Sequence, residues 1–260
     1  MRVALGISYN GQPYRGWQSQ PDGQTVQDRL EAALSRFANQ RIGTLCAGRT
    51  DAGVHALMQV VHFNTDIDRT TYAWVRGTNA NLPKDIAVHW ALHTSDEFHC
   101  RASAQSRRYA YVLLQSPIRP SIEVGRVGWT FDELDIEAMR AAAAILLGTH
   151  DFTSFRASQC QALTPVKTLI DIRITQRGNY VRLEFEANAF LHHMIRNIMG
   201  CLVLVGRGKK PVTWMHDVLA ARDRKAAAPT FSPEGLYFLG PRYDSRWGIP
   251  NRTPAFDWLP

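Results

Sequence analysis

The residues with the clearest chemical potential lie in the segment AGRTDAGVHA, at positions 47–56. Arg49 and Asp51 stand two residues apart between Gly48 and Gly53, directly after a run with strand character. Glycine adopts backbone angles that other residues avoid, so this pattern predicts a strand that ends in a tight turn. A turn between rigid elements can hold a polar side chain toward a ligand. A carboxylate held there would serve as a nucleophile or as a general base.

Two other interpretations of this segment must be weighed. Thr50 and Asp51 are of the residue types that often only cap backbone amides in a glycine-rich turn. Residues 43–50 also read G-x-x-x-x-G-R-T, one position away from the phosphate-binding loop G-x-x-x-x-G-K-[ST]. Arginine replaces the required lysine at position 49, and residues 44–47 have strand rather than loop character. A phosphate-loop nucleotide hydrolase therefore remains only a weaker alternative.

Composition bounds the class of protein. The chain has 260 residues, of which 45% are hydrophobic, enough for one or two globular domains with a substantial core. Its formal net charge is +7, which favours a polyanionic partner such as nucleic acid, because cationic side chains bind phosphates and release their counterions. Many basic proteins bind no nucleic acid, so a non-catalytic RNA-binding protein is an alternative that the charge supports without establishing.

The cysteines and histidines show no metal-binding spacing. The four cysteines contain no C-x-x-C pair, and the nine histidines form no H-E-x-x-H motif. The first residues lack the apolar run of a signal peptide, and the longest apolar stretch, residues 198–205, is too short to cross a bilayer. We therefore expect a cytoplasmic protein without a disulfide framework, a metal site or a membrane span.

The expected elements repeat in order along the chain. Apolar residues at alternating or helical spacing predict strands and helices, and Thr25 with Asp28 forms a capping box that opens the first helix. The expected strands lie near residues 3–7, 43–47, 59–63, 86–92, 107–115, 168–174, 181–186 and 236–239. The expected helices lie near residues 26–37, 72–80, 136–146, 193–205 and 212–222.

This order predicts the fold class. Each half approximates β-α-β-β-α-β, the ferredoxin-like unit. The sequence thus predicts an α+β fold with two such halves, residues 1–103 and residues 104–260. We expect the halves to join into one mostly antiparallel sheet flanked by helices, with a central cleft between them.

Three further residues invite both a functional and a structural interpretation. Arg196 lies in an apolar helical segment, where a guanidinium either snorkels to water or pairs with a carboxylate such as Asp51. Tyr109 and Tyr111 lie two apart on one expected strand and share a face. They are either core tyrosines with satisfied hydroxyls or a stacking platform for a nucleobase.

Basic residues are the other candidates for RNA contact. Any one of them is adequately explained as solvated surface charge, but as a set they could follow a phosphate backbone. Tyr14 and Trp17 lie in an expected loop, where aromatic side chains are often used in recognition. The candidate RNA-binding residues are Arg15, Trp17, Arg107, Arg108, Arg222, Arg224 and Lys225.

Many motifs of the chain together resemble one known family. AGRTDAGVHA followed by Q-V-V-H-F resembles the active-site motif of the bacterial tRNA pseudouridine synthase A (TruA) family. Y-N-G-x-x-Y-x-G-W-Q-x-Q, T-V-Q-x-x-L-E-x-A-L, N-A-N-L-P-x-D-I-A-V and F-H-x-R-x-S-A follow the same family in the same order. So do R-R-Y-x-Y, D-F-T-S-F-R-A, N-A-F-x-H-H-M-x-R-N and E-G-L-Y, so the resemblance covers nearly the whole chain.

The resemblance implies a function and a role for each matched residue. It implies a cofactor-free isomerase that converts uridine to pseudouridine in the anticodon stem-loop of tRNA, at tRNA positions 38, 39 and 40. By position in the motifs, Asp51 matches the catalytic aspartate and Arg49 matches an arginine that handles RNA. Tyr109 matches the tyrosine that stacks on the target base, and Arg196 matches the arginine that pairs with the catalytic carboxylate. The family also implies a homodimer with a basic cleft for tRNA.

Overall fold

The chain folds into two compact units. The computed structural model describes residues 1–250, and contacts within them separate Met1–Arg107, together with residues from Tyr237 onward, from Arg108–Leu236. Strand β5 (Ala104–Gln115) begins in the first unit and continues into the second. The chain returns to the first unit with β10 (Leu236–Tyr243), which pairs in parallel with β3 (His55–Asn64) through Tyr237 and Phe238. The last strand therefore packs with the first unit, although it follows the second unit in sequence.

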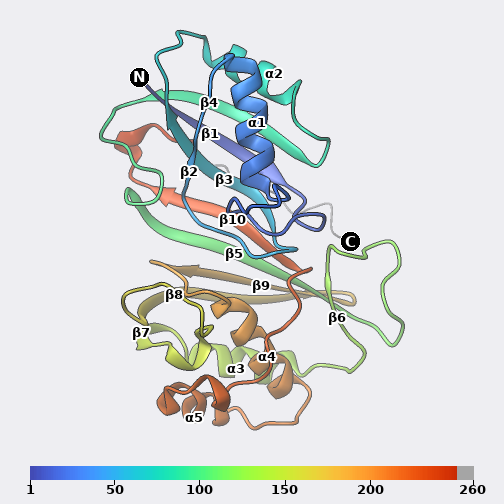
Figure 1. Cartoon of the computed structure of the whole chain (residues 1–260). Coiled ribbons are helices and arrows are strands. Elements are labelled where there is room, and N and C mark those ends of the chain that lie inside the picture. The colour runs from blue at the N-terminus through green and yellow to red at the C-terminus, as the bar shows by residue number, and fades with distance from the viewer. Residues whose placement is uncertain (251–260) are drawn as a thin grey trace. The chain divides into compact units, whose positions relative to one another are not determined.

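The first unit has the ferredoxin-like element order. It consists of β1 (Arg2–Tyr9), α1 (Val26–Ala38), β2 (Leu45–Cys46), β3, α2 (Thr71–Asn79) and β4 (Ile86–Thr94). Its sheet runs β4-β1-β3, and both β2 and β10 pair with β3. The first five pairing partners of β1 along β3 run from Asn64 to Val60, so the two strands are antiparallel. Figure 1 shows α1 lying across the strands β1 and β3.

The first helix forms where the capping box predicts it. The Thr25 hydroxyl accepts the Asp28 N–H at the N-terminus of α1, and Asn39 ends the helix in the left-handed conformation. The apolar face of α1 buries Val26, Leu30, Ala33 and Leu34. Beside it, Phe37 meets Trp74 of α2 edge-on, with 5.3 Å between the ring centroids.

Both faces of β1 are buried, so its residues do not alternate between apolar and polar. One face lies under the helices, and the other belongs to a second apolar cluster that contains Ala4, Val60, Phe98 and Tyr243. Residues beyond β4 and beyond β10 therefore cover the face that the helices leave open. A strand covered on both sides reads as a continuous apolar run, which the sequence Val-Ala-Leu-Gly-Ile shows.

The second unit has strands on one side and helices on the other. Its strands lie in the order β5-β9-β8-β7, and β6 (Gly128–Thr130) pairs in parallel with β5. The remaining strands are β7 (Gly148–Asp151), β8 (Val166–Arg177) and β9 (Tyr180–Ala187). Its helices are α3 (Ile136–Ala144), α4 (Met194–Gly206) and α5 (Trp214–Ala221), and α3 packs against both α4 and β8 (Figure 1).

The α+β fold with mostly antiparallel strands is confirmed within residues 1–250. Strands β6 and β7 were not expected from the sequence, because three and four residues are too few to show an alternating pattern. Among residues 1–250, none of the helices combines the length and hydrophobicity that a membrane span requires.

Candidate functional site

Asp51 lies in the turn that joins β2 to β3. The turn begins at Ala47, whose N–H donates to the Val60 carbonyl over 2.9 Å. It closes where the Val54 N–H donates to the Asp51 carbonyl over 3.1 Å, with Gly53 at a φ of +79°. Asp51 itself is half-buried. The predicted strand end and glycine turn are therefore present, and the turn holds Asp51 between two rigid strands.

Buried side chains satisfy the backbone of this turn. The carboxamide of Gln59, which is 0% exposed, donates to the Gly48 carbonyl over 2.5 Å and accepts the Gly48 N–H over 3.3 Å. The hydroxyls of Tyr9 and Thr50 share a buried hydrogen bond of 2.7 Å. Burial raises the pKa of Tyr9 above its ordinary value, so its hydroxyl stays protonated. Gln59 was not among the expected site residues, although it is a polar residue inside an apolar strand.

The loop between β1 and α1 braces the same turn. The Trp17 N–H donates to the Thr50 carbonyl over 3.0 Å. At Gly16, where φ is +86°, a Cβ would lie 2.8 Å from the Thr50 carbonyl oxygen. Earlier in the same loop, the Gly11 N–H donates to Nδ1 of His55, which is 3% exposed. Glycine is needed at position 16 because the two backbones approach too closely for a side chain.

The structure does not favour the expectation that Trp17 contacts RNA. Its side chain is 1% exposed, and its ring lies 5.9 Å from that of Tyr9, measured between centroids. Tyr14 is also buried, and its hydroxyl donates to the Asp85 carboxylate over 2.6 Å. Both aromatic residues anchor the loop to the core, so neither offers a free ring face to a base.

The arginines of the first unit have different surroundings. Arg49 and Arg15 are exposed, and Arg15 pairs with Asp22 over 2.6 Å. Arg107 donates to the carbonyls of Ala47, Ala104 and Arg101. Arg49 therefore lies accessible beside Asp51, whereas Arg107 binds the backbone at the start of the turn.

In the second unit, the two tyrosines of β5 differ. Tyr111 is 0% exposed, and its hydroxyl donates to the Ser232 carbonyl over 3.0 Å, so it is a core residue. Tyr109 is 8% exposed and meets Phe190 edge-on, with 5.1 Å between the ring centroids. The interpretation of both as a stacking pair is wrong for Tyr111. Arg108, which lies between Arg107 and Tyr109 in the sequence, is half-buried.

Arg196 on α4 does not simply extend into water. Its Nε donates to the Phe231 carbonyl over 2.8 Å, and the Phe231 N–H donates back to the Arg196 carbonyl over 3.1 Å. The next residue, Asn197, is 0% exposed and accepts from Arg224 over 3.1 Å. These bonds hold the half-buried Arg196 to the segment that precedes β10.

The three basic residues near residue 224 also differ from one another. The Arg224 guanidinium donates to Asn197, to Thr230 and to the Ala227 carbonyl, so its charge is engaged inside the unit. Arg222 is exposed, with 3.7 Å from its Nε to an Asp151 carboxylate oxygen, and Lys225 is exposed. Phosphate contact is thus better suited to Arg222 and Lys225 than to Arg224.

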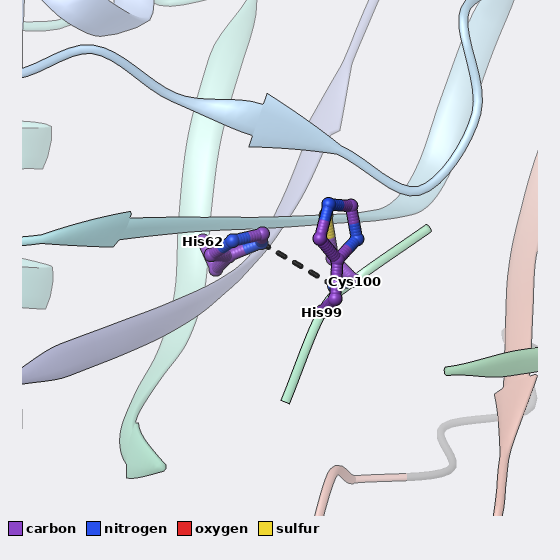
Figure 2. A group of neighbouring side chains, drawn as sticks. All are labelled: His62, His99 and Cys100. Atoms are coloured by element: carbon purple, nitrogen blue, oxygen red, sulfur yellow. Dashed lines mark hydrogen bonds between the residues drawn. The ribbon is translucent and has the colours of Figure 1, made fainter. Parts of the chain in front are cut away.

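The fold brings His62, His99 and Cys100 together, although their sequence spacing gives no sign of a cluster (Figure 2). Nδ1 of His62 accepts the Cys100 N–H over 3.3 Å, and Nδ1 of His99 accepts the Arg101 N–H over 3.1 Å. The proton of each neutral ring therefore lies on Nε2, and the lone pairs that a metal needs already accept backbone hydrogens. Burial also raises the pKa of the Cys100 thiol to about 12. The cluster is suited to holding residues 99–102 against β3 rather than to binding metal.

Comparison with known proteins decides the family. A family model described as tRNA pseudouridine synthase matches residues 7–101 and 142–244, which is well over half of the chain. The chain belongs to the tRNA pseudouridine synthase family. It is therefore an enzyme that isomerises uridine to pseudouridine in tRNA. Asp51 and Arg196 lie inside the matched ranges, and Tyr109 lies in the interval between them.

The match also extends to full-length relatives. Proteins named tRNA pseudouridine synthase A from Paracidovorax citrulli and Albidiferax ferrireducens are 67% and 68% identical to this chain. The protein of that name from Polaromonas naphthalenivorans is 67% identical. Each alignment covers 100% of both chains.

The close approach at Gly16 gives a first prediction. We expect Gly16→Ala to lower the free energy of unfolding by more than the ~1 kcal/mol of a left-handed backbone, because its Cβ also meets the Thr50 carbonyl. Gly23→Ala is the matched control, since Gly23 has a φ of +65° and open space around it. Urea unfolding of both variants measures the difference. Equal losses in the two variants would contradict the claimed contact.

The buried His62 gives a second prediction. Burial, with Arg2 and His99 nearby, lowers the pKa of His62 to about 4. Between about pH 6.5, the ordinary pKa of histidine, and about pH 4, a proton binds to His62 in the unfolded chain but not in the folded one. The free energy of unfolding should therefore fall as pH drops through this range, by up to ~3 kcal/mol. His62→Asn keeps an acceptor near Nδ1 but does not titrate. Urea unfolding against pH should therefore show a shallower fall in this variant than in the wild type or in the exposed-residue control His216→Asn. Identical pH profiles would contradict the assignment.

Proposed function

We propose that this enzyme modifies uridines of the anticodon stem and loop of tRNA and that Asp51 is its catalytic carboxylate. The observation that carries the proposal is the Asp51 turn, which stands in the matched family segment with its backbone fixed on both sides. Arg49, exposed two residues earlier, supplies a cation to the approaching RNA. A protein that only bound RNA would gain nothing from a carboxylate there, because it repels phosphate.

The reaction needs a positioned carboxylate but no net redox change. The bond between C1′ of the ribose and N1 of uracil breaks, the base turns, and C1′ bonds to C5 of the base. C5 then loses its proton to solvent while N1 gains one, so atoms and electrons balance without a cofactor. Asp51 serves as the nucleophile or as the base in these steps. Both roles require its ionised form.

Tyr109 and Arg196 complete the proposed site by their resemblance to family residues. We propose that Tyr109 takes the face of the flipped uracil and that Arg196 stabilises the ionised carboxylate of Asp51. Tyr109 is 8% exposed, so an entering base would have to displace neighbouring side chains to reach its ring. The bond from Nε of Arg196 to the Phe231 carbonyl supports this role because it fixes the direction of the guanidinium.

We also propose a cytoplasmic homodimer, as the family resemblance implies. Between β5 and α3 the second unit exposes Ile118, Ile122 and Phe131, which are 75%, 89% and 60% exposed. Apolar surface of this kind is commonly buried when proteins associate. Light scattering in solution should give a mass twice that of the chain, and a monomer mass at micromolar concentration would contradict this.

The catalytic role of Asp51 gives a third prediction. Asp51→Asn should bind tRNA with the affinity of the wild type within about threefold, while release of tritium from C5 of labelled uridine falls below detection. The amide keeps the shape of the side chain but cannot act as nucleophile or base. Asp68→Asn, at an exposed position elsewhere in the first unit, is the control and should stay fully active. Turnover retained in Asp51→Asn would remove Asp51 from the catalytic role.

The exposed basic residues give a fourth prediction. Replacing Arg222 and Lys225 with alanine should make the plot of log affinity for tRNA against log salt less steep by up to about 2, since each phosphate contact contributes about 0.7–0.9 to the slope. The control pair Arg36→Ala and Arg41→Ala removes two exposed arginines from the first unit. An unchanged slope in the Arg222 and Lys225 variant would place the RNA elsewhere.

A further inference from the structure

We propose that Gln59 is a positioning residue for catalysis, which sets the backbone of the Asp51 turn through its side-chain carboxamide. This inference rests on the proposed catalytic role of Asp51. It adds a residue that does not touch the substrate and that acts only through the turn.

Gln59 lies at the end of the β2–β3 pairing. The last backbone bond before the turn joins the Ala47 N–H to the Val60 carbonyl. At the next residue, Gly48, both backbone groups bond instead to the side chain of Gln59, over 2.5 Å and 3.3 Å. A carboxamide carries a donor and an acceptor side by side, so it replaces a partner strand for one residue.

Gln59 is also linked, through Tyr9, to Thr50, the residue beside Asp51. The Gln59 side chain lies close enough to the Tyr9 hydroxyl to influence its pKa, and that hydroxyl shares a 2.7 Å hydrogen bond with Thr50. Gln59, Tyr9 and Thr50 are 0%, 4% and 7% exposed, so water does not substitute for these bonds. The network fixes the chain at Gly48 and at Thr50. Asp51 is the next residue after Thr50, so these two anchors set the position from which its carboxylate extends.

The bonds to Gly48 depend on which side chain stands at position 59. Methionine has nearly the length of glutamine but would leave the Gly48 N–H and carbonyl without their partners. Glutamate would retain an acceptor, but its ionised form could not donate to the Gly48 carbonyl. Its protonated form would donate again, and burial at this position raises the pKa of a carboxyl group. Glutamate therefore provides a pH-dependent restoration of the original bond.

The experiment measures single-turnover tritium release and tRNA affinity separately. Gln59→Met should lower the rate constant at saturating enzyme by about 10- to 100-fold, with the Kd for tRNA unchanged within about threefold, because displacement of a catalytic group slows chemistry more than binding. Gln40→Met is the control in the same unit, since Gln40 also donates a side-chain hydrogen bond, but its partners Thr65 and Ser35 lie outside the turn. It should keep the wild-type rate.

The second variant tests the hydrogen bond itself. The rate of Gln59→Glu, divided by the wild-type rate at the same pH, should rise as pH falls from 8.5 to 5.5, while the same ratio for Gln59→Met stays flat. Protonation of the introduced carboxyl also restores stability, so each rate is divided by the folded fraction measured at the same pH by circular dichroism. A role limited to stability would then leave the corrected ratio flat. A folded Gln59→Met with the wild-type rate overturns the inference. If Gln59→Met does not fold, a flat ratio for Gln59→Glu overturns it.

Asp51→Asn, measured in the same assay, separates the inference from the function on which it rests. If Asp51→Asn is active, the catalytic role of Asp51 fails and the role of Gln59 fails with it. If Asp51→Asn is inactive while Gln59→Met keeps the full rate, only the inference about Gln59 fails.

Discussion

The hydrogen bonds between the Gln59 carboxamide and the backbone of Gly48 are the interaction on which the Asp51 turn depends. A chain that leaves a sheet gives up its backbone partners, and buried backbone groups without partners are costly. A flexible exposed loop would satisfy them with water but would not hold a carboxylate in one direction. Here a buried side chain satisfies them, so the turn is fixed without being part of the sheet.

The same solution recurs along β3. Gln59, His55 and His62 are polar residues in a buried strand, and each accepts the N–H of a segment outside the strand. Those segments are the Asp51 turn, the loop at Gly11 and the segment at Cys100. Strand β3 thus orders three surrounding loops through its side chains. Because these groups are buried, replacement by apolar residues would leave the loop N–H groups unsatisfied.

Local features of the fold were predictable from the sequence where one element determines them. The Thr25 capping box, the first helix and the strands near residues 168–174 and 181–186 all depend on residues close in sequence, and all are confirmed. Features that depend on residues far apart were not predictable. Trp17 was expected to contact RNA, but only the folded structure shows that it is 1% exposed and that its N–H donates to the carbonyl of Thr50, beyond α1.

The candidate site also has a part that was predictable from the sequence and a part that was not. The turn around Asp51 was predictable because glycines and charges mark it directly, whereas its support comes from Gln59 on β3 and Tyr9 on β1. Arg224 looked like one of several surface cations, yet its partners Asn197 and Thr230 engage it inside the second unit. A sequence pattern identifies residue types, but burial and hydrogen-bond partners decide which charges stay available to RNA.

The most direct test of the central claim is a crystal structure of the enzyme bound to an anticodon stem-loop that carries 5-fluorouridine at the target position. Fluorine at C5 cannot leave as a proton does, so the modified nucleotide should be retained at the site of chemistry. We predict that a carboxylate oxygen of Asp51 lies in contact with the ribose or the base of that nucleotide. A carboxylate that faces away from the extruded nucleotide, bonded to main-chain amides, would contradict the account.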